Sequence, residues 1–160
     1  MPSFKLLFVC LGNICRSPAA DGVMNRLVKE AGLLDEIHID SAGTAGWHVG
    51  KHADPRMRKA GAQRGYGFSH IARQVRAEDL AEYDLILVMD DQNRRDLLAL
   101  DPQRQYDGKI RHFCEFCTEY SDREVPDPYY GGDAGFQHVI DLMEDGCSGI
   151  LLEIQRRLAQ

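Results

Sequence analysis

The stretch FKLLFVCLGNICRSPAA, residues 4–20, joins a strand pattern directly to a helix pattern. Residues 4–10 form a largely apolar run of strand length, which is typical of a strand buried on both faces. A short glycine-containing turn follows, and Ser17-Pro18 then has the pattern of a helix N-cap with proline at the first helical position. Apolar residues continue at helical spacing until Gly32, which supplies a stop signal. This succession predicts the first unit of an α/β fold.

Strand-like and helix-like segments alternate along the rest of the chain. This alternation predicts a three-layer α/β fold, in which helices cover both faces of a parallel sheet. No repeat or linker divides residues 1–160, so we expect one domain. Further strands are predicted at residues 37–40, 85–89 and, more weakly, 109–113. Further helices are predicted from Asp54-Pro55 to near Gly65, from the capping residues Asp90 and Asp91 through Leu100, and from Asp133 onward, with Gly146 and Gly149 as candidate points of disturbance.

The composition describes an ordinary globular chain whose overall charge is unfavourable for polyanions. Of the 160 residues, 44% are apolar and 28% are charged, and 19 basic against 25 acidic residues give a net charge of −6. This balance argues against nucleic acid and against a membrane surface as partners. No apolar run approaches the ~20 residues of a membrane span, and the amino terminus lacks a signal-peptide pattern. Five cysteines are an odd number, so we expect free thiols and a cytoplasmic location.

The loop at residues 10–17, Cys-Leu-Gly-Asn-Ile-Cys-Arg-Ser, carries the features of a local anion site. It lies where a strand of a parallel sheet meets a helix amino terminus, which offers unpaired N–H groups and a positive dipole. Gly12 and Asn13 tolerate left-handed backbone angles, so successive amides can turn inward. Arg16 adds a planar fork for phosphate oxygens. Because the helix end and Arg16 would stabilise a thiolate at Cys10, this residue is a candidate nucleophile for phosphoryl transfer.

The bare pattern of cysteine, five residues and arginine is not specific, since the chain contains it twice. The second copy, residues 117–123, has no glycine and carries Glu119 and Asp122, which would repel phosphate. The first copy also lacks the Gly-Lys-Ser/Thr ending of a nucleotide-binding loop, which disfavours ATP. Its context between strand and helix, rather than the pattern itself, makes residues 10–17 the candidate site.

The segment Val9–Pro18 closely resembles the signature of the low-molecular-weight protein tyrosine phosphatases, in their bacterial form. The resemblance implies a four-stranded parallel sheet and metal-free, cofactor-free hydrolysis of phosphotyrosine through a phosphocysteine, with inorganic phosphate as product. It implies tyrosine-phosphorylated proteins as partners, and bacterial members often oppose a tyrosine kinase. The similarity continues through Asp40–Thr44, Trp47, Asp54–Arg56, Ala72–Gln74, Met89-Asp90 and Asp127–Gly131, which is nearly the whole chain.

The resemblance also implies a role for each residue of the loop. Cys10 would be the nucleophile, Arg16 would bind the phosphoryl group, and Ser17 would hydrogen-bond the thiolate. Asn13 would hold the loop in shape, helped by Ser41 and His70. The phosphate-binding loop would consist of Leu11, Gly12, Asn13, Ile14, Cys15, Arg16 and Ser17.

The general acid is the point at which the residues alone leave a choice open. Asp90 and Asp91 are also expected at the carboxyl edge of the sheet and compete with Asp127 for this role, although capping of the next helix already explains them. The resemblance selects Asp127, held between prolines, first as acid and then as the base that activates water. It also implies an aromatic rim that selects phosphotyrosine over phosphoserine, formed by Trp47, His48, Tyr129 and Tyr130. A lone tryptophan is more often a packing anchor, but Trp47 lies in a glycine-rich polar stretch.

The remaining cysteines leave several hypotheses open. Cys15 lies close enough in sequence to Cys10 to form a protective reversible disulfide. Cys114 and Cys117, with His112 nearby, suggest structural or redox thiols, or zinc, for which no fourth ligand is evident. Arsenate reduction on the same fold is one alternative function, although no cysteine lies between Cys15 and Cys114 to relay a disulfide. A phosphotyrosine-binding module without catalysis and a dithiol oxidoreductase are the others.

Overall fold

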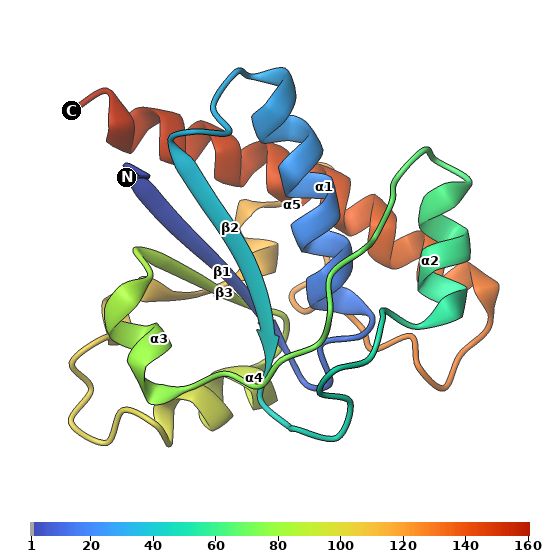
Figure 1. Ribbon diagram of the computed structural model, residues 1–160, viewed down its shortest axis with the longest axis horizontal. Helices are drawn as coiled ribbons and strands as arrows, with labels where there is room; N and C mark the ends of the chain where they lie inside the picture. Colours follow the sequence, from blue (N-terminus) through green and yellow to red (C-terminus); the bar gives the residue numbers. More distant parts are fainter. Residues whose placement is uncertain (1) are drawn as a thin grey trace.

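The computed structural model describes residues 2–160 and is built around one parallel sheet of four strands (Figure 1). The strand order is β2-β1-β3-β4, so the first strand lies in the middle. The sheet confirms the predicted class, but β2 runs three residues beyond the predicted end because residues 41–43 pair with residues 8–10 of β1. The strands are β1 Phe4–Cys10, β2 Ile37–Gly43, β3 Leu85–Val88 and β4 Ile110–His112.

Helices cover both faces of the sheet, as predicted. Alternate side chains of β1 point to opposite faces. Phe8 belongs to the core cluster that includes residues of α1, α2 and α5, and Leu7 to the cluster that includes residues of α3 and α4. The helices of these two groups cover the two faces of the sheet (Figure 1). Sequence reasoning missed α3, which is too short for a helical period to be visible. The helices are α1 Arg16–Glu30, α2 Pro55–Ala62, α3 Ala77–Glu82, α4 Asp91–Leu98 and α5 Asp133–Leu158, with short 3-10 turns η1 Asp107–Lys109 and η2 Phe113–Phe116. Within residues 2–160, none of these helices combines the length and apolar character that crossing a bilayer requires.

The start of α1 differs from the prediction that Ser17 is its N-cap. The helix begins at Arg16 after Cys15, and Ser17 lies inside the first turn. The Ser17 hydroxyl is instead 3.0 Å from the Cys10 sulfur, so it serves the loop rather than the helix end. The second predicted cap is confirmed, since Asp54 accepts a hydrogen bond from the Arg56 amide and Pro55 occupies the first turn of α2.

The long helix α5 is continuous through Gly146 and Gly149, so the predicted disturbance there was wrong. Both glycines instead permit close packing of η2. A Cβ atom on Gly146 would lie 2.3 Å from the ring of Phe113, and one on Gly149 would lie 2.2 Å from the carbonyl oxygen of Phe116. The missing side chains therefore let η2, and the segment that follows it, lie directly on the helix.

Replacing Gly146 by alanine should destabilise the protein. The added methyl group meets the fully buried Phe113 ring, and overpacking of this kind costs about 1–3 kcal/mol, against a gain of at most about 1 kcal/mol in helix propensity. Urea unfolding measures the difference. Gly135→Ala in the same helix is the matched control, because its Cβ would make only an ordinary contact at 3.6 Å with Pro128. Equal stability of the two variants would contradict the packing argument.

Candidate active site

The predicted nucleophile lies at the carboxyl end of the central strand. Cys10 is the last residue of β1, is buried, and is followed by a loop that enters α1. The loop turns back on itself at Asn13, whose φ of 57° is left-handed. As a result, the Asn13 amide donates to the Cys10 sulfur at 3.3 Å, and the Ser17 hydroxyl approaches the same sulfur at 3.0 Å. The Cys10 sulfur therefore lies between two hydrogen-bond donors, next to the start of α1.

The Asn13 side chain holds this loop through all of its hydrogen-bonding positions. Its amide nitrogen donates to the hydroxyls of Ser17 at 2.7 Å and Ser41 at 3.1 Å. Its oxygen accepts from the Arg73 amide at 2.9 Å and contacts His70 Nε2 at 3.0 Å. Ser41 and His70 thus lie where the sequence analysis expected support for the loop. The contribution of the Arg73 amide could not be predicted, because a backbone donor has no signature in the pattern of side chains.

Arg16 is buried beneath the loop and is held by partners from distant parts of the chain. Its Nη1 donates to Asp90 Oδ2 at 2.7 Å and to the Val125 carbonyl at 3.0 Å. Its Nη2 lies 3.6 Å from Asp127 Oδ2. Burial opposes its charge, but Cys10, Asp90 and Asp127 together raise the pKa of the Arg16 guanidinium, which therefore stays a cation. Asp90 also caps α4 through Asn93, so its capping role and its contact with Arg16 coexist.

An open pocket of about 220 Å³ lies above the loop. Asp127 stands at its edge, 40% exposed, with Oδ1 accepting from the Tyr129 amide at 3.1 Å. Tyr129 and Tyr130 meet edge to face with ring centroids 4.9 Å apart, and Trp47 is 69% exposed. Each residue predicted for the rim therefore lines the same pocket as the loop. Its lining consists of Cys10, Leu11, Gly12, Ile14, Cys15, Arg16, Trp47, His48, Asp127, Tyr129 and Tyr130.

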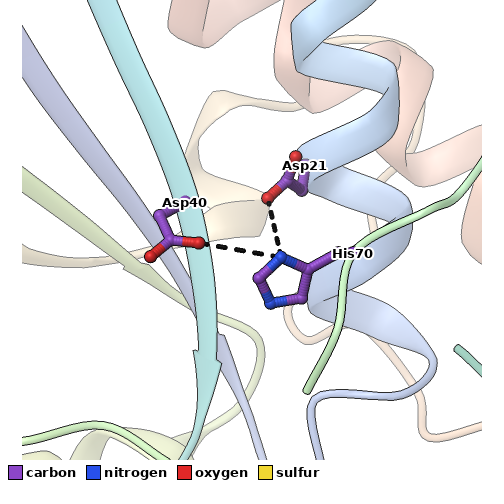
Figure 2. Close-up of side chains that lie close together, drawn as sticks. All are labelled: Asp21, Asp40 and His70. Carbon is purple, nitrogen blue, oxygen red and sulfur yellow. Dashed lines mark ion pairs between the residues drawn. The ribbon is translucent and has the colours of Figure 1, made fainter. Parts of the chain in front are cut away.

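A second group of titratable side chains lies behind the loop, and sequence reasoning did not find it. Figure 2 shows Asp21 from α1 and Asp40 from β2 both facing His70. The two carboxylates each lie 3.7 Å from His70 Nδ1, on the opposite side of the ring from the contact with Asn13. Burial raises the pKa of Asp21 to about 7, with Asp40 adding to the shift, and burial also lowers the pKa of His70.

These three side chains have the ligand atoms of a metal site, since the atoms lie within 4.8 Å of one another. However, Arg73 already donates to Asp40 at 2.9 Å, and this adjacent positive charge disfavours a cation. Within residues 2–160 this is the one group of three such side chains whose ligand atoms come this close, and His112, Cys114 and Cys117 are not members of it.

The chain is similar to known proteins over nearly its whole length. The family described as low molecular weight phosphotyrosine protein phosphatase matches residues 5–160. A Synechocystis protein assigned to the low molecular weight protein-tyrosine-phosphatases is 54% identical over 154 residues, which are 96% of this chain and 98% of the relative. The low molecular weight phosphotyrosine protein phosphatase of Homo sapiens is 38% identical over 151 residues, 92% and 93% of the two chains. A crystal structure of a protein tyrosine phosphatase from Entamoeba histolytica has a TM-score of 0.93 at 47% identity and covers 96% of this chain and 98% of its own.

Replacing Asp21 by asparagine should change how stability depends on pH. A carboxyl group in an unfolded chain titrates near 3.9, whereas the pKa of Asp21 in the folded chain is about 7. The unfolded chain therefore loses this proton first as the pH rises, and the parent loses stability between about pH 4 and pH 7. Asp21→Asn cannot ionise, so its stability relative to the parent should rise across this window by up to about 1.4 kcal/mol per pH unit.

Urea unfolding at pH 5 and pH 7.5 measures this difference. Asp35→Asn, an exposed change in the turn before β2, is the control for the general effect of losing one negative charge. A stability difference between Asp21→Asn and the parent that does not change with pH would contradict the assignment.

Proposed function

Since the chain belongs to the low molecular weight phosphotyrosine protein phosphatase family, we propose that it hydrolyses phosphotyrosine with the residues gathered around Cys10. The observation that carries the proposal is the meeting of a thiol, a buried arginine and a carboxyl group in one pocket. Cys10 lies at the end of β1 beneath the loop, and Arg16 Nη2 and Asp127 Oδ2 face each other at 3.6 Å. These are the groups that attack phosphorus, neutralise the phosphoryl oxygens and protonate the leaving group.

In the first step, the Cys10 thiolate attacks phosphorus and forms the P–S bond. The P–O bond to the tyrosine breaks, and protonated Asp127 gives its proton to the leaving phenolate. In the second step, ionised Asp127 takes a proton from water as the water oxygen attacks phosphorus. The P–S bond then breaks, which releases inorganic phosphate and restores the thiolate and the protonated carboxyl.

Arg16 is arranged to bind the phosphoryl group while remaining fixed. Asp90 and the Val125 carbonyl occupy Nη1, which leaves Nη2 directed toward the pocket and Asp127. A phosphoryl group in the loop would accept from Nη2 and from the inward-facing backbone amides. Because Asp90 sets the orientation before substrate arrives, little reorganisation is needed in the transition state.

The rim favours an aromatic ester over an aliphatic one. Exposed Trp47 and the pair Tyr129 and Tyr130 stand above the loop, and apolar Ile14 lines the pocket beside them. A phenyl ring is long enough to reach past these side chains while its phosphate contacts Cys10, whereas a serine side chain is shorter. We infer that the substrates are tyrosine-phosphorylated proteins, among them targets of a bacterial tyrosine kinase in the cytoplasm. We also propose that residues 1–160 act as one domain.

Arsenate reduction receives less support from the arrangement of the cysteines. Cys114, the next cysteine after Cys15, lines a separate pocket from the one that contains Cys10. Because the two cysteines share no pocket, the arrangement does not favour a disulfide relay from Cys10 to Cys114. Hydrolysis of a phosphate ester therefore explains the site better than arsenate reduction does.

Hydrolysis of aryl phosphates in the presence of a chelator tests the assignment. Cys10→Ser should lower turnover by about 10⁴-fold or more, because the nucleophile is lost. Asp127→Ala should lower kcat by about 10²–10⁴-fold with phenyl phosphate, because the leaving group then departs without a proton. The loss should be smaller with p-nitrophenyl phosphate, whose leaving group needs protonation less. Asp91→Ala, an exposed acid at the same sheet edge, should retain activity, whereas activity that survives Cys10→Ser would overturn the proposal.

We further propose that Cys15 protects Cys10 during oxidation. Burial, together with Asp54 and Cys10, raises the pKa of the Cys15 thiol, so it keeps its proton while Cys10 reacts. Hydrogen peroxide oxidises the Cys10 thiolate to a sulfenic acid, and Cys15 then forms the disulfide and displaces water.

Peroxide treatment followed by a thiol reductant measures this protection. Parent protein should recover most of its activity, while Cys15→Ser should recover little, because its sulfenic acid proceeds to irreversible products. Cys114→Ser is the control and should recover like the parent. Full recovery of Cys15→Ser would refute the protective role.

A further inference from the structure

A second pair of thiols, Cys114 and Cys117, takes no part in the reaction described above. Cys114 lies in η2, and Cys117 is the first residue after η2. The Cys117 amide donates to the Cys114 carbonyl at 3.2 Å, which closes a turn. The ends of such a turn have Cα atoms within about 7 Å, and a disulfide requires roughly 4.4–6.8 Å. The backbone therefore already holds the two Cα atoms near the separation that a disulfide needs.

The two thiols have different surroundings. Cys114 lines an open surface pocket of about 540 Å³, which Cys117 does not line. The Cys117 sulfur instead lies 3.8 Å from the Leu142 carbonyl of α5. The neighbouring Cys117 thiol lowers the pKa of Cys114 despite burial and nearby acids, and Cys114 in turn raises the pKa of Cys117. Both residues are half-buried, but Cys114 opens onto the pocket while Cys117 faces α5, an arrangement that suits an attacking and a resolving cysteine.

The charge of the pocket limits which oxidant can reach Cys114. Four acidic side chains, Asp91, Glu115, Asp122 and Glu124, line it together with Arg123 and His112. Anionic reagents such as glutathione disulfide are repelled by this surface, whereas a small neutral peroxide is not.

We propose that Cys114 and Cys117 form a second redox site, at which a small neutral peroxide converts the dithiol to a disulfide independently of Cys10. The Cys114 thiolate attacks one peroxide oxygen, the O–O bond breaks, and the released hydroxide takes up a proton to become water. Cys114 is then a sulfenic acid. The Cys117 sulfur attacks the Cys114 sulfur and forms the S–S bond. The hydroxyl group of the sulfenic acid leaves as water with the Cys117 proton. The dithiol is oxidised by two electrons, and the peroxide is reduced to two molecules of water.

The test uses the full chain with Cys10→Ser and Cys15→Ser, so that only the second pair can react in this way. After exposure to hydrogen peroxide, tryptic digestion releases both cysteines on one peptide, residues 112–123. Mass spectrometry should find this peptide lighter by two hydrogens, and dithiothreitol should restore it. In the same background, Cys117→Ser should stop at a Cys114 sulfenic acid that dimedone traps, while Cys114→Ser should stay reduced at Cys117. Oxidation of Cys117 in Cys114→Ser at the parent rate would overturn the assigned roles.

Two further comparisons separate a built site from ordinary thiol chemistry. Disulfide formation should be at least tenfold faster with hydrogen peroxide in the folded chain than in the urea-unfolded chain, and equal rates would refute the site. Glutathione disulfide at the same concentration should react with the folded chain at least tenfold more slowly than with the unfolded chain. A faster reaction with the folded chain would refute the charge argument.

A separate test examines whether the second pair acts independently of Cys10. With Cys10 and Cys15 intact, Cys114→Ser should leave the rate of peroxide inactivation unchanged, and a several-fold change would disprove independence.

Discussion

The buried amide of Asn13 is the contact on which the nucleophile loop depends. A left-handed backbone is costly for most residues, and asparagine is one of the few that adopts it at low cost. The side chain then binds two hydroxyls and accepts from Arg73 and His70, so its four hydrogen-bonding positions are filled from three separate segments. The same backbone turn directs the Asn13 amide at Cys10. Sheet, helix α1 and the segment after α2 thus meet at one side chain.

The acidic composition and the anion site are compatible because the positive charge is local. The chain has a net charge of −6, yet the loop uses backbone amides, a helix end and one buried guanidinium. Asp90 holds that guanidinium in place and keeps it charged. A general basic surface is therefore unnecessary, and recognition can rest on the fit of one phosphoryl group and one ring.

The features that could be predicted from sequence are those that depend on neighbouring residues. The apolar run of β1, the loop of residues 10–17 and the cap at Asp54 are local signals, and the structure contains each of them. The remaining features depend on contacts between residues that are distant in the sequence. Ser17 has the local pattern of a cap, but its hydroxyl lies 3.0 Å from the Cys10 sulfur, a contact that only the family resemblance implied. The cluster of Asp21, Asp40 and His70 brings together three separate segments that share no sequence motif. The role of Gly146 and Gly149 in α5 depends on the ring of Phe113 and the carbonyl of Phe116 in η2, which the local sequence does not reveal.

The central position of β1 also has a consequence for folding. The strand that carries Cys10 pairs with Leu85 and its neighbours far along the chain, and the Arg16 side chain binds a carbonyl that lies 109 positions away. Contacts between such distant segments form slowly, because the entropy of a long loop is lost before they stabilise anything. The loop can therefore acquire its working geometry only after most of the sheet has assembled.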